Sequence, residues 1–165
     1  MLLVRHSVPA ADPSVPSEDW PLSEEGRALC EALAGQVDAY EPQRLFSSPE
    51  PKALETAELI APALGLDVEV DDGLRETARR TVGWLEQEVL HEGIRQLFAR
   101  PDEVVFGEES GRAALARFSR VVEAVEEPAV FVTHGTVMSL YLAGSDPDGG
   151  FAFWNTLGLP DVVLL

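Results

Sequence analysis

The chain has 165 residues, 45% of them hydrophobic and 25% charged, which is enough to bury the core of one ordinary globular domain. Its 29 acidic side chains outnumber the 12 basic ones, giving a formal net charge of -17 at pH 7. Nucleic acid and anionic membranes are therefore excluded as expected partners, because both require a basic surface.

The first elements are a strand and a capped helix. The apolar run at residues 2–4 predicts a short buried strand. Ser23 is expected to cap a helix whose first turn carries Glu24 and Glu25, where the helix dipole favours acids. The apolar stripe expected on this helix consists of Leu29, Leu33, Val37 and Tyr40.

A second strand, a second helix and a third strand follow. Residues 44–47 (RLFS) predict the second strand. Pro51 suits the first position of a helix that runs through Ala63, and Gly65 closes it. The alternating stretch at residues 67–70 (DVEV) predicts the third strand.

The second half continues the alternation of helices and strands. Residues 77–99 are mostly helical in pattern, with glycines at 83 and 93 as weak points, and residues 101–109 read as a loop. A helix is predicted from about residue 111 to 126, ended by Pro128. The remaining predictions are strands at 129–133, 151–153 and 161–165, and a helix that begins within 137–142.

Strands that alternate with helices of ten or more residues predict a three-layer α/β/α sandwich with a mostly parallel central sheet. Neither a repeat nor a linker divides the chain, so residues 1–165 are expected to form one domain. Ligands of such sheets bind beyond the carboxyl ends of the strands. The polar residues at or after the ends of the predicted strands are Arg5, His6, Ser47, Ser48, Glu76, Thr133 and His134, and Gly135 follows just before a helix N-terminus.

Four ordered stretches carry a family resemblance. They are LLVRHS at 2–7, DWPLSEEGRALCEALA at 19–34, LFSSPEPKALETAELIA at 45–61 and VFVTHGTVMSLYLA at 130–143. In this order they resemble the signature of the histidine phosphatase superfamily, which has the phosphoglycerate mutase-like fold. The resemblance implies a short, phosphatase-type member with a single catalytic domain.

The residue types at these positions suit phosphoryl transfer, in which charge develops on the phosphoryl oxygens. Arg5 offers a planar fork of donors, and Lys52 offers a second, point-like cation. His134 can donate to a phosphate oxygen, and the amides of the helix that starts near Gly135 favour an anion. His6 is the expected nucleophile, because neighbouring cations favour its neutral form and leave a nitrogen lone pair free.

The leaving alkoxide needs a proton donor. The resemblance places the family's acid at Glu76, after the third strand. Asp71 and Asp72 lie nearby in the sequence and are the alternative donors. A carboxylic acid serves this role near neutral pH only when burial or phosphate charge raises its pKa.

Two positions depart from the family pattern. Ser7 stands where the family has glycine, so its hydroxyl is expected to contact the substrate or its backbone to tolerate a side chain there. Lys52 stands where the family has a second arginine, and lysine cannot form a bidentate clamp. Both departures keep a donor or a positive charge, and Lys52 is expected to change affinity or substrate geometry.

Structural interpretations compete with these roles. Arg5 and His6 by themselves suit a solvated strand end, and the two serines at 47 and 48 suit an N-cap and a turn, with Ser47 as a candidate substrate contact. The tryptophans, Trp20, Trp84 and Trp154, are interpreted as packing residues.

The leading hypothesis is a metal-independent phosphomonoesterase, of the histidine acid phosphatase type, that acts through a phosphohistidine on His6. The alternatives are a phosphoglycerate-type mutase and a non-catalytic module that binds phospho-ligands or proteins. No spacing typical of metal ligands is present, so neither a metal nor a cofactor is expected. The expected partner is a small phosphorylated substrate or a phosphohistidine on another protein, and no feature indicates an oligomeric state.

The expected location is the cytoplasm. No secretory signal precedes the first charged residue, and no apolar run approaches the roughly 20 residues that cross a bilayer.

Overall fold

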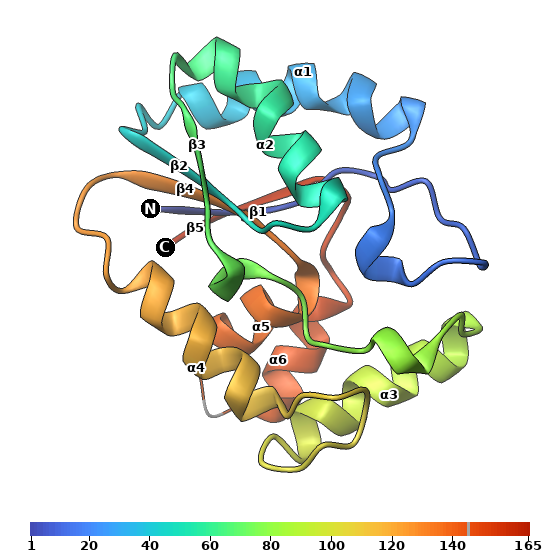
Figure 1. Cartoon of the computed structure of the whole chain (residues 1–165). Helices are drawn as coiled ribbons and strands as arrows, with labels where there is room; N and C mark the ends of the chain where they lie inside the picture. The colour runs from blue at the N-terminus through green and yellow to red at the C-terminus, as the bar shows by residue number, and fades with distance from the viewer. Residues whose placement is uncertain (145) are drawn as a thin grey trace.

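A five-stranded sheet forms the middle layer of the computed structural model, which describes residues 1–144 and 146–165 (Figure 1). The strands are β1 (Leu2–Arg5), β2 (Arg44–Ser47), β3 (Val68–Val70), β4 (Ala129–Thr133) and β5 (Asp161–Leu164). Their order is β3-β2-β4-β1-β5, with the first four parallel and β5 antiparallel to β1. The predicted fold class, a mostly parallel α/β sheet, is confirmed.

Helices cover both faces of this sheet (Figure 1). One face carries α1 (Glu24–Asp38) and α2 (Pro51–Leu64). The other carries α3 (Gln87–Ala99), α4 (Gly111–Val122), α5 (Gly135–Ala143) and α6 (Pro147–Trp154). None of the helices in the described parts of the chain combines the length and apolar character needed to cross a bilayer.

Alternating side chains of the strands divide the core into two clusters. Those that pack under α1 and α2 are Leu2, Val4, Leu45, Val130 and Val132. Those that face the opposite cluster include Leu3, Phe46 and Phe131. The sheet is therefore buried on both sides, as a parallel sheet requires.

The predicted helix ends are confirmed at three positions. The Ser23 hydroxyl accepts a hydrogen bond from the Gly26 N–H at the start of α1. Pro51 begins α2, and Gly65 ends it with a left-handed φ of 64°. The predicted stripe of α1 is partly wrong, because the helix ends before Tyr40, and Tyr40 and Leu29 are exposed.

Two stretches differ from the predictions. Residues 151–153, expected as a strand, lie in α6, where the Asp146 side chain caps the helix and Phe151 stacks on Trp154. Residues 77–86 hold only a short 3-10 turn, because the Glu108 carboxylate accepts the N–H groups of Arg80 and Thr81. The helix predicted to reach residue 126 ends at residue 122.

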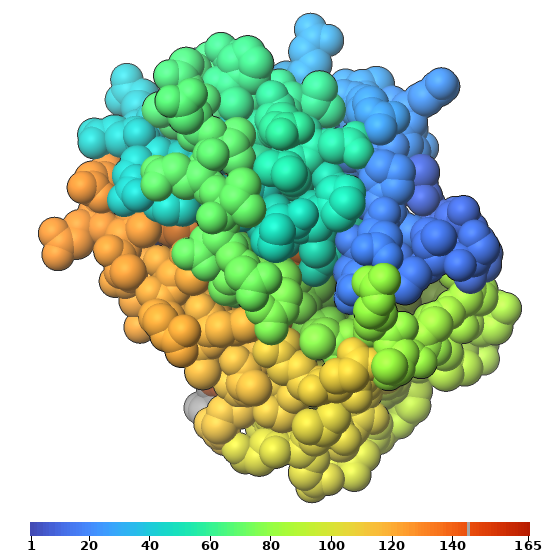
Figure 2. Space-filling view, in the orientation of Figure 1, coloured from blue at the N-terminus to red at the C-terminus, as the bar shows by residue number. Residues whose placement is uncertain are grey.

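The loop after β1 meets the segment before α3 on one face of the molecule. In the space-filling view the blue N-terminal loop lies directly against the yellow-green segment (Figure 2). Arg80 joins them through ion pairs with Glu18 and Asp19. Exposed pairs of this kind contribute only about 0–1 kcal/mol each, so they orient the two loops more than they stabilise the fold.

Candidate active site

The predicted site residues meet at the carboxyl ends of three neighbouring strands. The His6 N–H donates to the Thr133 carbonyl at 2.9 Å, which continues the pairing of β1 with β4. The Ser48 N–H donates to the Val132 carbonyl at 3.0 Å on the other side of β4. The rings of His6 and His134 thereby come edge to face, with centroids 5.1 Å apart.

His6 is held with one ring nitrogen bonded and the other free of partners among the described residues. Its Nδ1 lies 2.7 Å from the Ser7 carbonyl, which can only accept, so Nδ1 carries the proton. The Nε2 atom then holds the lone pair of the neutral ring. Burial lowers the pKa of His6 well below its usual range, and the neighbouring His134 and Lys52 act in the same direction. The neutral, nucleophilic form is therefore the stable one at pH 7.

Ser7 is fully buried, and its hydroxyl donates to the Gly26 carbonyl of α1 at 2.8 Å. Its N–H donates to the Thr56 hydroxyl at 3.0 Å. The structure thus places the Ser7 hydroxyl against α1, where it fixes the loop below His6. Gly26 must be glycine, because a Cβ there would lie 2.1 Å from the Val8 carbonyl oxygen.

His134 is also fully buried, and Ser48 orients it. Its Nε2 lies 2.8 Å from the Ser48 hydroxyl and 3.6 Å from a Glu50 carboxylate oxygen, while its Nδ1 has no hydrogen-bond partner among the described residues. Burial lowers the pKa of His134 well below its usual range, with Lys52 adding to the effect and Glu76 opposing it. When Ser48 donates to Nε2, the proton of the neutral ring sits on Nδ1, free for a phosphate oxygen.

The two predicted cations flank the histidines. Arg5 donates through Nη1 to the carbonyls of Leu157 and Gly158, at 2.9 and 3.3 Å, and its buried Nε has no partner among the described residues. A Cβ on Gly135 would lie 3.1 Å from that Nε, so glycine lets the guanidinium approach the start of α5. Lys52 is buried with its Nζ 2.6 Å from a Glu50 oxygen and 2.7 Å from the Ser17 carbonyl.

Glu76 lies at the same edge and is buried. One carboxylate oxygen accepts the Thr77 N–H at 2.8 Å, and the other accepts the Thr136 N–H at 3.1 Å, in the first turn of α5. Burial acts to raise the pKa of Glu76, but the Arg79 charge and the Thr77 N–H help to lower it overall. Glu76 is therefore a carboxylate until an anionic ligand offsets these positive groups.

Three other predicted site residues, Ser47, Asp71 and Asp72, make contacts that differ from those expected. The Ser47 hydroxyl donates to the Ser48 carbonyl at 2.9 Å, and neither serine is the N-cap of α2, which is Glu50. Asp71 accepts the Gly73 N–H, and Asp72 pairs with Arg75 at the surface. These side-chain contacts of the two aspartates lie within their own turn, away from the histidines, so Glu76 is the acid that the structure brings to the site.

Sequence reasoning missed three participants, Glu50, Ser48 in its contact with His134, and Arg79. Glu50 connects the site, since its two oxygens bind Lys52 and the Glu76 N–H, at 2.6 and 2.7 Å. Its position two residues before Lys52, in a segment otherwise typical of a phosphate pocket, was the available signal. Arg79 acts through its charge on Glu76 and His134, which no spacing in the sequence indicates.

The two neutral histidines make folding sensitive to acid. The unfolded chain takes up protons on His6 and His134 near pH 6.5, whereas the folded chain does not, so stability falls as the pH drops below about 6.5. Each histidine lowers the free energy of unfolding by up to about 1.4 kcal/mol for each pH unit below that value. In urea unfolding, the free energy of unfolding should fall between about pH 7 and 5.5 in both proteins, by about 1 kcal/mol less in His6→Asn than in the parent. An equal loss in both proteins would contradict the neutral state of His6.

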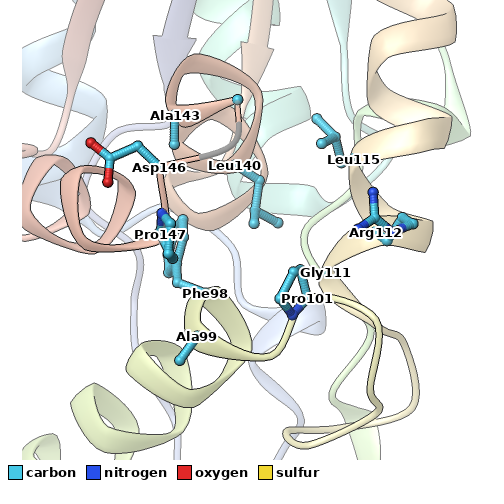
Figure 3. Close-up of a pocket in the computed structure, with 11 residues that line it drawn as sticks. Phe98, Ala99, Pro101, Gly111, Arg112, Leu115, Leu140, Ala143, Asp146 and Pro147 are labelled. Carbon is cyan, nitrogen blue, oxygen red and sulfur yellow. The ribbon is translucent and has the colours of Figure 1, made fainter.

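A cavity of about 250 Å³ lies among α3, α4, α5 and α6, and none of its lining residues is a predicted site residue (Figure 3). Its lining residues include Phe98, Leu115, Leu140 and Pro147, which belong to α3, α4, α5 and α6. Its charged residues are already engaged, Arg112 with Asp102 and the Asp146 carboxylate with the Gly149 N–H.

Across residues 1–144 and 146–165, no three His, Cys, Asp or Glu side chains gather closely enough to hold a metal ion.

Comparisons with known proteins agree with this arrangement. The chain is 25% identical to a mycobacterial glucosyl-3-phosphoglycerate phosphatase, with a TM-score of 0.73 over 96% of this chain and 84% of that one. A protein from Thermus thermophilus, TTHB049, is 28% identical with a TM-score of 0.67, over 84% of this chain and 80% of that one. A phosphoserine phosphatase from Entamoeba histolytica shares the fold, with 19% identity and a TM-score of 0.73 over 98% and 87% of the two chains.

No curated protein matches the chain. The sequence model of the histidine phosphatase superfamily (branch 1) matches residues 1–159, nearly the whole chain. Together with the paired histidines at the strand ends, this match shows that the chain belongs to the histidine phosphatase superfamily.

Proposed function

We propose that the protein is a phosphomonoesterase that forms a phosphohistidine on His6 and needs no metal ion. The observation that carries the proposal is the state of His6, whose Nδ1 is bound to the Ser7 carbonyl 2.7 Å away. This bond fixes the tautomer and leaves the Nε2 lone pair available beside His134, Arg5 and Lys52. The solved phosphatases that resemble the chain support the same reaction class.

The reaction proceeds in two displacements at phosphorus. In the first, the Nε2 lone pair of His6 forms the P–N bond while the ester P–O bond breaks, and the leaving oxygen takes a proton from Glu76. In the second, water attacks phosphorus, its proton passes to the Glu76 carboxylate, and the P–N electron pair returns to Nε2. Inorganic phosphate leaves, and the residues regain their starting state.

Glu76 becomes protonated when a phosphate ester binds, because the bound phosphate raises the pKa of its carboxyl group. The Arg79 charge lowers the pKa of the Glu76 carboxyl against the effect of burial. A phosphate group adds negative charge close to the same cations, which raises the pKa of the carboxyl again. A phosphate monoester loses its second proton near pH 6, so the complex gains a proton most readily below about that pH. We expect the reaction to be fastest on the acid side of neutrality.

The proposal is tested by measuring phosphate release from a panel of phosphate monoesters with and without a chelator. We expect release that the chelator leaves unchanged and that orthovanadate inhibits. Release that depends on added metal would overturn the metal-independent mechanism. Isomerisation of phosphoglycerate without net release of phosphate would identify a mutase instead.

One observation favours a second function, the binding of a phospho-ligand without turnover. A Glu50 carboxylate oxygen lies 2.6 Å from Lys52 Nζ, and both side chains are largely buried. An incoming phosphate must compete with this carboxylate for its second cation. Tight vanadate binding, measured by calorimetry, with no release from any ester of the panel would select the binding function.

A further inference from the structure

A cavity of about 280 Å³ lies between the loop after β1 and the segment before α3. Its walls are mostly apolar or aromatic and include Trp20, Trp84, Leu85, Leu90 and Phe106. An apolar cavity of about 150 Å³ is already large enough for benzene. The space therefore suits one aromatic ring with a short linker.

Two residues of the cavity wall, Ser17 and Arg79, also act on groups of the proposed active site. Ser17 lines the cavity, and the carbonyl of the same residue accepts the hydrogen bond from Lys52 Nζ at 2.7 Å. Arg79 also lines it, and the charge of Arg79 lowers the pKa values of Glu76 and His134. A molecule with its phosphoryl group at His6 can thus extend its organic part into this cavity.

Arg79 marks the junction between the charged and the apolar parts. Its Nη1 atom is buried and has no hydrogen-bond partner among the described residues, and its guanidinium carbon lies 5.9 Å from the Phe106 ring centroid. A buried donor without a partner is unusual in a native protein, and an ester or phosphate oxygen at this point would satisfy it. The same cation favours a ring stacked beside Phe106.

Two tryptophans, Trp20 and Trp84, form part of the cavity wall. Their ring centroids are 5.9 Å apart at an interplanar angle of 48°, and Trp20 Nε1 donates to the carbonyls of Asp12 and Val15. Trp84 remains 51% exposed, which is high for a side chain that only packs. Arg80 joins this segment to the opposite loop through its ion pairs with Glu18 and Asp19.

We propose that the cavity receives the aromatic group of an arylalkyl or aryl phosphate monoester, which makes such esters the preferred substrates. This inference rests on the proposed phosphatase function. The phosphoryl group lies at His6, the Arg79 guanidinium meets the oxygens at the junction, and the ring lies between Trp20, Trp84 and Phe106.

The experiment compares 2-phenylethyl phosphate with ethyl phosphate, because both release primary alcohols and differ mainly in the ring. The parent protein should show a kcat/KM ratio of at least tenfold in favour of the phenylethyl ester. Trp84→Ala should lower that ratio at least fivefold, and Trp84→Phe should restore most of it. Tyr40→Ala, which removes an aromatic side chain that is 48% exposed beyond the end of α1, is the matched control and should leave the ratio unchanged.

Binding of two non-hydrolysable analogues separates this inference from the proposed function. 2-Phenylethylphosphonate should bind at least tenfold more tightly than ethylphosphonate by calorimetry, and Trp84→Ala should remove the difference. If neither ester is hydrolysed but the phosphonates behave as described, the phosphatase function is wrong and the aromatic cavity stands. If both esters are hydrolysed at similar kcat/KM and the phosphonates bind alike, the cavity proposal is overturned and the phosphatase stands.

Discussion

Replacing His6 with asparagine should lower phosphate release by at least about 10⁴-fold, since loss of a covalent nucleophile costs more than loss of any supporting group. The asparagine amide can take the place of Nδ1 and keep a hydrogen bond to the Ser7 carbonyl. It has no counterpart of Nε2, so the substitution removes the nucleophilic atom with little other change. The measurement is the initial rate of phosphate release from 4-nitrophenyl phosphate.

The third histidine provides a matched control for this variant. His91 lies in α3, where its ring packs against Trp154 at 5.1 Å between centroids, outside the contacts of the paired histidines. His91→Asn should keep activity within about threefold of the parent, and calorimetric binding of inorganic phosphate by His6→Asn should show that its pocket is intact. Comparable activity in the parent and in a folded His6→Asn protein would remove His6 from the mechanism.

Replacing Glu76 with glutamine should separate substrates by their leaving groups. Glutamine keeps acceptor oxygen for one of the two backbone N–H groups, those of Thr77 and Thr136, but cannot supply a proton. Ethyl phosphate needs a proton on its departing oxygen, so its kcat should fall by about 10²–10⁴-fold. The nitrophenolate of 4-nitrophenyl phosphate leaves without one, and its kcat should fall by less than about tenfold.

The comparison of the two esters also controls for damage to the site. Distortion of α5 or of the phosphate pocket would slow both esters equally, whereas loss of a proton donor slows only the alkyl ester. Asp72→Asn, a surface substitution next to Arg75, is a control for the removal of an acid after β3. Equal losses on both esters would show that Glu76 positions the start of α5 and that the proton comes from elsewhere.

Local sequence signals predicted much of the fold. Ser23, Pro51 and Gly65 define helix ends through capping and backbone preferences that act within a few residues. The continuous apolar run at 129–133 became the fully buried central strand β4. These elements form where neighbouring residues alone decide the conformation.

The errors arose where distant contacts decide. The apolar run at 151–153 suits a strand or a helix, and only its packing in α6 resolves the choice. Residues 77–86 lose their helical pattern because Glu108, 27 and 28 positions away, takes two of their N–H groups. No local pattern reports such a contact.

The candidate site also combines residues that the sequence proposed with features that it did not reveal. The sequence proposed His6, His134, Arg5, Lys52 and Glu76 as site residues, and the structure brings all five to one edge of the sheet. It did not identify Glu50 as the link between Lys52 and the Glu76 backbone, because a carboxylate in a phosphate pocket runs against the expected charge. The cavity beside Arg79 was also missed, since its walls come from segments that lie far apart in the chain.

The most direct test of the mechanism is to trap the phosphoenzyme. The protein is mixed with ³²P-labelled ester, quenched with alkali within the first turnover and digested, and the labelled peptide is sequenced by mass spectrometry. The mechanism predicts one label on His6 that survives alkali, is lost in acid, and forms and decays fast enough to account for turnover. Steady hydrolysis with no label on His6, or with an acid-stable label on another residue, would contradict it.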